Sequence, residues 1–184
     1  MIVGRATSAR PFSLYCSSMG IVREAVLSDL VALKQLIKRS YDQLLRDDYA
    51  PALIDQALPF LTKPPVDFIR LGQYYVYEEG GVIYAAGGWA RQGSIPSSMP
   101  QGYATIRMLV ADPDHVRHGC ASEVFNQIIA ASKLAGLKGL YGPATRNSLG
   151  FFRNKGFVLG GDDTIDLAGD GSILFPVMWL KLDF

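Results

Sequence analysis

The chain has 184 residues, enough for one domain and too few for two catalytic domains. Apolar residues make up 49% of it and charged residues 19%, so it can bury a sizeable core and is not disordered. Its 18 Lys and Arg residues nearly balance 17 Asp and Glu residues, and the formal charge of +1 leaves no basic footprint for a nucleic-acid backbone.

The lengths of the apolar runs and the positions of the cysteines give further expectations about cellular compartment, membrane insertion and metal binding. The longest nearly apolar runs, 81–90 and 172–180, have about ten residues, whereas a membrane-spanning helix needs roughly 20. Cys16 and Cys120 lie far apart, and neither histidine has a cluster of cysteines or carboxylates around it. We therefore expect a soluble cytoplasmic protein with no disulfide framework, no metal, no membrane and no nucleic-acid partner.

The first twenty residues differ in composition from the rest. They carry Arg5, Arg10 and four serines but no acidic residue. A targeting peptide would have this composition, but an apolar secretion signal is missing and Met19 offers an alternative start. We expect residues 1–20 to form a flexible extension and residues 21–184 to form the domain.

The domain is predicted to begin with a short strand and two helical stretches. Residues 21–25 give a strand signal, and residues 30–37 repeat apolar side chains with helical period behind a Ser-Asp cap. A second helical stretch, over about 41–61, is expected to break at Pro51 and Pro59. These helices are expected to form a lid segment between strands.

The middle of the domain predicts a β-hairpin followed by a loop. Residues 74–77 and 82–89 are rich in aromatic and β-branched side chains and flank a Glu-Gly-Gly turn. Residues 92–102 contain prolines, serines and glycines, which favour a loop.

The second half predicts strands around an amphipathic helix. Residues 103–111 form the next strand, and apolar spacings of three and four predict a helix over about 119–135, closed by Gly136. A strand, a short helix and two closing strands follow at about 139–142, 148–154, 157–159 and 173–180. Locally paired strands with a strand–helix–strand crossover indicate a mixed sheet with helices on its faces.

The segment 106–121, IRMLVADPDHVRHGCA, joins a strand to a helix through a proline turn. The first turn of a helix offers unpaired N–H groups and the positive end of the peptide dipoles, so a loop entering it can surround a phosphate. Gly119 and Ala121 are small enough to let an anion approach that backbone. Taken alone, the segment is equally well an ordinary strand-to-helix connection that contains a glycine.

Three segments resemble the GCN5-related N-acetyltransferase (GNAT) superfamily. Residues 116–121, VRHGCA, are similar to its motif A, Arg/Gln-x-x-Gly-x-Gly/Ala, and residues 145–157, TRNSLGFFRNKGF, to the Asn-Ala-x-x-Phe-Tyr-x-x-x-Gly-Phe of its motif B. Residues 21–37, IVREAVLSDLVALKQLI, resemble its opening strand and helix. Together they cover residues 21 to about 160 in the family's order and spacing.

The resemblance implies an α+β (mixed α/β) fold whose sheet is mixed and mostly antiparallel, is flanked by helices and contains a splayed parallel strand pair. By position, that pair is 103–111 and 139–142, and the slot between the strands would hold the pantetheine arm of acetyl-CoA or another acyl-CoA. Strand main chain would hold the acyl carbonyl and the pantetheine amides, and loop N–H groups would take the pyrophosphate. The cofactor-binding residues implied are Leu109, Val110, Ala111, Val116, Arg117, His118, Gly119, Cys120, Ala121, Asn147 and Phe152.

The chain departs from the family pattern at several positions. Val116 replaces the Arg/Gln and Ala121 replaces the commoner glycine, and both changes keep the backbone donors. Phe152 stands where many members have a tyrosine that protonates the departing thiolate, and Thr105 falls where some relatives have a glutamate base. Neither residue can perform that proton transfer at neutral pH, so the catalytic residues are unknown.

Several further side chains have either a functional or a purely structural interpretation. The candidates for a distant general base are Asp47, Asp48, Glu78 and His115. Each of them is more simply explained as a solvated surface charge. Arg107 is either a substrate-facing or a structural cation. A nucleophilic Cys120–His118 pair is conceivable because a helix N-terminus lowers a thiol pKa, although the resemblance places Cys120 at a variable, inward position.

We therefore expect an acyl-CoA-dependent N-acyltransferase that transfers acetyl to an amine of a small molecule or peptide by direct attack, with a homodimer possible. The alternatives are a non-catalytic acyl-CoA-binding or regulatory module and a GNAT fold without affinity for CoA. The acceptor pocket would be built by residues 41–61, the loop 92–102 and the chain after Gly160.

Overall fold

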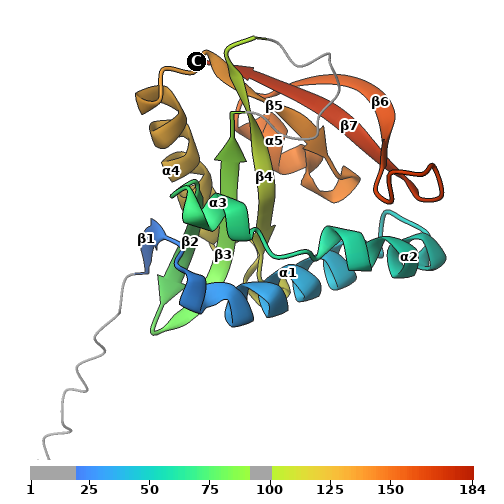
Figure 1. Ribbon diagram of the computed structural model, residues 1–184, viewed down its shortest axis with the longest axis horizontal. Coiled ribbons are helices and arrows are strands. Elements are labelled where there is room, and N and C mark those ends of the chain that lie inside the picture. Colours follow the sequence, from blue (N-terminus) through green and yellow to red (C-terminus); the bar gives the residue numbers. More distant parts are fainter. Residues whose placement is uncertain (1–19, 92–100) are drawn as a thin grey trace, which may run out of the picture.

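A seven-stranded sheet in the order β1-β2-β3-β4-β5-β7-β6 organises this computed structural model, which describes residues 20–91 and 101–184 (Figure 1). The strands are β1 (Ile21–Glu24), β2 (Tyr74–Glu79), β3 (Val82–Ala90), β4 (Tyr103–Ala111), β5 (Gly139–Ala144), β6 (Val158–Asp166) and β7 (Leu174–Asp183). Of the described strands, only β4 and β5 pair in parallel, and the other neighbours are antiparallel. The expected mixed, mostly antiparallel sheet is confirmed. Most of the expected extension, Cys16 and most of the expected loop 92–102 lie outside the described residues.

Helices cover both faces of the sheet. They are α1 (Leu30–Leu44), α2 (Pro51–Leu61), α3 (Val66–Arg70), α4 (Cys120–Leu134) and α5 (Leu149–Asn154). Tyr74 and Val76 pack with α1 and α3, whereas Tyr75 packs with α4 and α5, because successive side chains of a strand point to opposite faces. In Figure 1, α1 and α2 run one after the other along the lower side of the view. No helix in the described part of the chain is long and apolar enough to cross a membrane.

The second helical stretch differs from its prediction. Helix α1 continues to Leu44, and Pro51 begins α2 instead of interrupting a helix, because a first-turn N–H has no helical partner to lose. Pro59 does not break α2, which ends two residues later at Leu61. Helix α3 was not predicted, since five residues after two prolines are too few to show a helical period.

Strand β4 leaves its parallel partner after a short contact. Residues 103–105 of β4 pair with residues 139–141 of β5, after which β5 pairs with β7 alone and β4 with β3 alone. Within the described part of the chain, the main chain of residues 106–111 therefore has no strand partner on its β5 side. The expected splay between these two strands is present.

A β-bulge lies in β4 where the two strands separate. Ala86 pairs with Val110 but Gly88 pairs with Arg107, so Met108 and Leu109 together face the single residue Gly87. Met108 has φ 46°, a conformation uncommon outside glycine, and the Tyr74 hydroxyl donates a hydrogen bond to its carbonyl at 3.0 Å. Tyr74 is fully buried, so the bulge is anchored in the core.

Candidate functional site

A cleft of about 540 Å³ lies beside the bulge, within the range of small-molecule sites. Its walls come from the end of β4, the following loop and first turn of α4, the segment 145–154, and the last two turns of α1. Of the sequence-predicted binding residues, those that line it are Leu109, Val110, Ala111, Val116, Arg117, Gly119, Cys120, Ala121, Asn147 and Phe152. His118 is not among the lining residues; it is exposed, and its Nδ1 lies 3.1 Å from the Val116 carbonyl oxygen.

The loop between β4 and α4 presents main-chain donors. Arg117 and Gly119 both have left-handed backbone conformations, with φ of 69° and 88°. Ser122 and Glu123 make the first helical hydrogen bonds, to the Gly119 carbonyl, so the amides of Cys120 and Ala121 precede the helical pattern. A Cβ added at Gly119 would meet no atom within 4 Å, which places this turn against open space.

Arg39 on α1 holds this loop in place. Its guanidinium contacts the Asp112 carboxylate at 2.8 Å and the Asp114 carboxylate at 2.8 Å. Asp112 is 7% exposed and also accepts a hydrogen bond from the Asp114 amide at 2.9 Å. The ion pairs therefore fix the turn that leads into α4 against the helix that forms the opposite cleft wall.

The turn on the other side of the cleft is fixed by hydroxyl groups. Thr145 donates to the Asn147 side-chain oxygen at 2.6 Å, and Ser148 donates to the Thr145 carbonyl at 2.7 Å. The Tyr49 hydroxyl accepts from the Arg146 amide and donates to the Pro176 carbonyl, both at 3.0 Å. Tyr49 thus joins the α1–α2 connection to this turn and to β7.

No acidic side chain is among the described residues that line the cleft, whereas Arg117 and His115 are. Asp47 and Asp48 are exposed after α1, and Glu78 on β2 pairs with Arg23 at 2.5 Å. Of the four base candidates, the structure brings only His115 to the cleft. Its ring lies tilted against Tyr84 with centroids 4.1 Å apart, and its buried Nδ1 has no hydrogen-bond partner among the described residues.

Phe152 forms part of the apolar wall. It is 6% exposed and packs edge-on against Phe151 and Phe157, with centroids 5.3 and 5.1 Å apart. Thr105 is fully buried and does not line the cleft. Burial raises the pKa of the Cys120 thiol, which disfavours the thiolate that nucleophilic catalysis would need.

The segment 41–61, expected to build an acceptor pocket, reaches the cleft only at its start, and sequence reasoning did not include Ser40. The lining residues here are Ser40, Tyr41 and Leu44 of α1 and Leu45, which directly follows the helix. Burial raises the pKa of Tyr41 to about 12, so its hydroxyl stays neutral at physiological pH. The helical spacing of apolar residues in α1 predicted that one face of the helix is buried. Such spacing does not tell whether a residue of that face packs in the core or lines a cleft.

Among the residues at 20–91 and 101–184, no three His, Cys, Asp or Glu side chains are gathered so that they could hold a metal ion. The lining of the cleft is instead main chain, hydroxyl and amide groups, apolar side chains, the Cys120 thiol, the His115 imidazole and the Arg117 guanidinium. Such a lining suits an elongated ligand that carries amides and an anionic group.

Several solved structures share this architecture. A GCN5-related N-acetyltransferase from Rhodopseudomonas palustris is 18% identical, with a TM-score of 0.69 over 91% of this chain and 97% of its own. The PaiA N-acetyltransferase from Thermoplasma acidophilum, solved with coenzyme A, is 14% identical, with a TM-score of 0.67 over 90% of this chain and 99% of its own. YncA from Salmonella typhimurium, solved with acetyl-CoA, is 15% identical, with a TM-score of 0.61 over 89% and 93% of the two chains.

The chain therefore has the fold of the GCN5-related N-acetyltransferases, which the sequence motifs predicted. No protein-family model matches the sequence, and no curated protein matches it significantly. At these identities the likeness concerns the fold.

Proposed function

We propose that this protein is an acyl-CoA-dependent N-acyltransferase that transfers an acyl group, most simply acetyl, to an amine of a small molecule or peptide. One observation carries the proposal: β4 and β5 part after residues 105 and 141, beside a cleft that ends at the N-terminus of α4. Fold neighbours solved with CoA or acetyl-CoA support it.

The described residues fit an acyl-CoA. Its pantetheine arm carries two amides, and the unpaired edge of residues 106–111 offers main-chain donors and acceptors to them, as a strand edge does to a peptide. Its pyrophosphate suits the loop around Arg117 and Gly119, whose amides lead into a 15-residue helix. No Asp or Glu side chain is among the described residues that line the cleft, so none of them would repel the phosphates.

The reaction would be a direct attack. The neutral amine attacks the thioester carbonyl carbon, the C–N bond forms, the C–S bond breaks, and CoA leaves as a thiolate while the nitrogen loses a proton. A main-chain N–H near Leu109 and Val110 would stabilise the oxygen as its charge develops. A thiol with a pKa of about 8.5 leaves without an acid, which makes the absence of a hydroxyl at Phe152 tolerable.

Proton removal from the amine would fall to His115 or to water. His115 is the titratable base that the structure places in the cleft lining. A proton can pass from the amine through water to such a group without direct contact.

The proposal is tested by calorimetric titration of the full chain with acetyl-CoA and by thiol release from acetyl-CoA across a panel of amines. We expect micromolar binding, a raised melting temperature and amine-dependent thiol release. Absence of binding at millimolar acetyl-CoA would contradict the assignment.

A non-catalytic acyl-CoA-binding module is the second candidate, favoured by Phe152 and Thr105 at the positions of the usual acid and base. It predicts acetyl-CoA binding of the same strength without thiol release for any amine. The two measurements together therefore separate the candidates.

A further inference from the structure

Arg107 on β4 is a partly buried cation that the fold does not neutralise. Its Nε is buried and has no hydrogen-bond partner among the described residues. All 17 Asp and Glu residues of the chain lie within the described residues, and none forms an ion pair with Arg107. Burial lowers the pKa of the guanidinium, since desolvation disfavours its charged form, although an arginine remains protonated.

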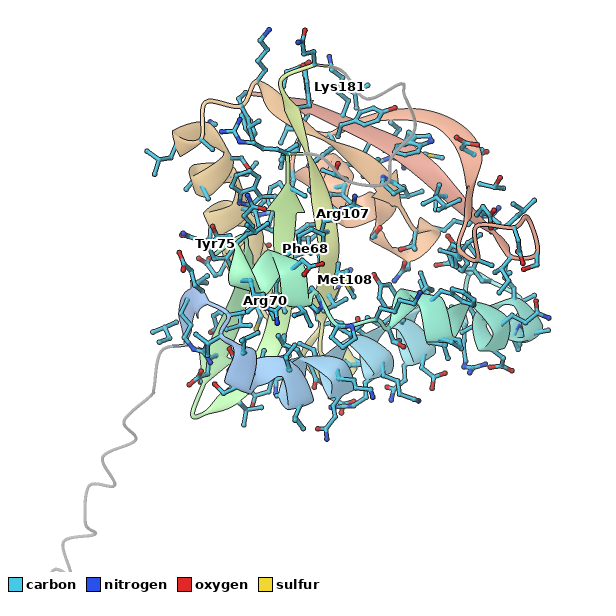
Figure 2. All side chains as sticks on the ribbon, viewed as in Figure 1. Phe68, Arg70, Tyr75, Arg107, Met108 and Lys181 are labelled. Atoms are coloured by element: carbon cyan, nitrogen blue, oxygen red, sulfur yellow. The ribbon has the colours of Figure 1, made fainter. Side chains whose placement is uncertain are left out.

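Three other arginines of the domain are paired with carboxylates. Arg23 contacts Asp29 and Glu78, Arg39 contacts Asp112 and Asp114, and Arg46 contacts Asp42 and Asp55. Each of these cations is held by carboxylates at 2.5 to 2.9 Å. Arg107 has instead the ring of Phe68, whose centroid is 5.9 Å from its Cζ (Figure 2). A ring face attracts a cation, but it does not replace the carboxylate oxygens that accept from the N–H groups of the paired arginines.

The position of Arg107 connects it to the cleft. It directly precedes the bulged pair Met108–Leu109, and Leu109 is the first β4 residue that lines the cleft. Because consecutive Cα atoms are about 3.8 Å apart, the Cα atoms of Arg107 and Leu109 are at most about 7.6 Å apart. The acyl end of a bound acyl-CoA would lie along this part of β4, so Arg107 is near the reacting groups.

We propose that Arg107 binds a carboxylate of the substrate next to the thioester. A guanidinium recognises a carboxylate through two parallel hydrogen bonds. A ligand with a carboxylate would therefore supply the acidic partner that no Asp or Glu of this chain provides. The carboxylate belongs either to the acceptor, as in an amino acid, or to the acyl group, as in a dicarboxylic acyl-CoA. The inference rests on the proposed function and names its substrate class.

The test compares the wild type with Arg107→Gln, Arg107→Lys and Arg107→Met, and with Arg70→Gln as a matched control. Arg70 is exposed on α3, next to Phe68 in Figure 2, and makes no ion pair within the described part of the chain. Melting temperatures of all variants report folding, and Arg107→Met replaces the cation with an apolar chain that does not leave an orphaned donor.

The acceptor arm measures thiol release from acetyl-CoA with amino acids and with the corresponding amino acid amides. We expect the wild type to prefer the carboxylates by at least about tenfold in kcat/KM, mostly through KM, and Arg107→Gln to lose this preference. Arg107→Lys should restore part of it, and Arg70→Gln should keep it.

The acyl arm measures binding of succinyl-CoA and acetyl-CoA by calorimetry, without any turnover. If the carboxylate belongs to the acyl group, the wild type binds succinyl-CoA more tightly and Arg107→Gln loses only that difference. If Arg107→Gln affects carboxylate and neutral ligands equally in both arms, the inference is overturned. Failure of the wild type to bind either acyl-CoA would instead refute the proposed function itself.

Discussion

Gly87 on β3 lies directly against Leu109 on β4: a Cβ added at Gly87 would be 3.1 Å from the Leu109 Cα and 2.7 Å from its Cδ1. Leu109 is the second residue of the bulge and lines the cleft. The absence of a side chain on one strand thus allows the neighbouring strand to bulge where acyl-CoA is proposed to bind.

Gly87→Ala should therefore weaken acetyl-CoA binding. The leucine side chain can rotate away, but the contact with the Leu109 Cα requires the main chain of the bulge to move. Such overpacking costs about 1 to 3 kcal/mol. We expect the Kd for acetyl-CoA, measured by calorimetry, to rise on the order of tenfold.

Gly161→Ala is the matched control, because a Cβ at Gly161 on β6 would meet nothing within 4 Å. It should leave the Kd unchanged. Equal effects of the two substitutions would show that the bulge does not contribute to acyl-CoA binding.

Asp112→Ala should destabilise the loop before α4 more than Arg39→Ala. The Asp112 side chain is 10% exposed and accepts from both Arg39 and the Asp114 amide, whereas the Arg39 side chain is 44% exposed and can turn to water. Arg39→Ala should lower the free energy of unfolding by about 1 kcal/mol or less, and Asp112→Ala by about 1 to 3 kcal/mol.

Urea denaturation measures these differences, and calorimetry should show weaker acetyl-CoA binding in both variants. Lys38→Ala serves as a control, since Lys38 contacts Asp42 at 3.3 Å on the exposed side of α1. If Arg39→Ala lowers the free energy of unfolding more than Asp112→Ala does, Asp112 is not the residue that mainly stabilises the turn.

The loop into α4 could be predicted from the sequence because its determinants are local. Pro113 marks the turn, Gly119 supplies the positive φ of 88°, and helical periodicity begins at Cys120. Such features depend on neighbours in the chain, so the short segment 113–120 contains them.

The bulge could not be predicted, because its determinants are distant. Met108 is no glycine, and its φ of 46° is held by the Tyr74 hydroxyl, 34 residues away, and by the space above Gly87. Strand β6 likewise extends to Asp166 through polar, exposed residues that show no strand pattern, because β7 supplies their pairing. Partners of this kind leave no periodic signal in the sequence.

Cys120 should behave as an inert thiol. It is 6% exposed, and burial raises its pKa above the ordinary value, so ionisation needs a higher pH than for a free cysteine. In a Cys16→Ser background, iodoacetamide should modify Cys120 slowly at pH 7, and faster only as the pH rises above the ordinary thiol range. Mass spectrometry after incubation with acetyl-CoA should find no acetyl adduct, and a stable adduct on Cys120 would revive the nucleophilic mechanism.

Asp29 should make stability depend on pH at the acidic end. Its carboxylate contacts the Arg23 guanidinium at 2.7 and 3.0 Å and accepts from the Val26 amide at 2.8 Å, and these contacts lower its pKa from the ordinary 3.8. A pKa lowered by folding stabilises the native state above the unfolded pKa, and this contribution is lost as the pH falls through the folded value.

Asp29→Asn should thus lower the free energy of unfolding at pH 7 by about 1 to 2 kcal/mol, between the values for exposed and buried pairs. The difference from the wild type should be constant between pH 5 and pH 7 and should shrink below about pH 4, because protonation removes the same charge from the wild type. Urea denaturation across this range measures the difference, with Asp48→Asn as an exposed control without an ion pair in the described part of the chain. A difference that stays constant down to pH 2 would show that the lost stability does not depend on the charge of Asp29.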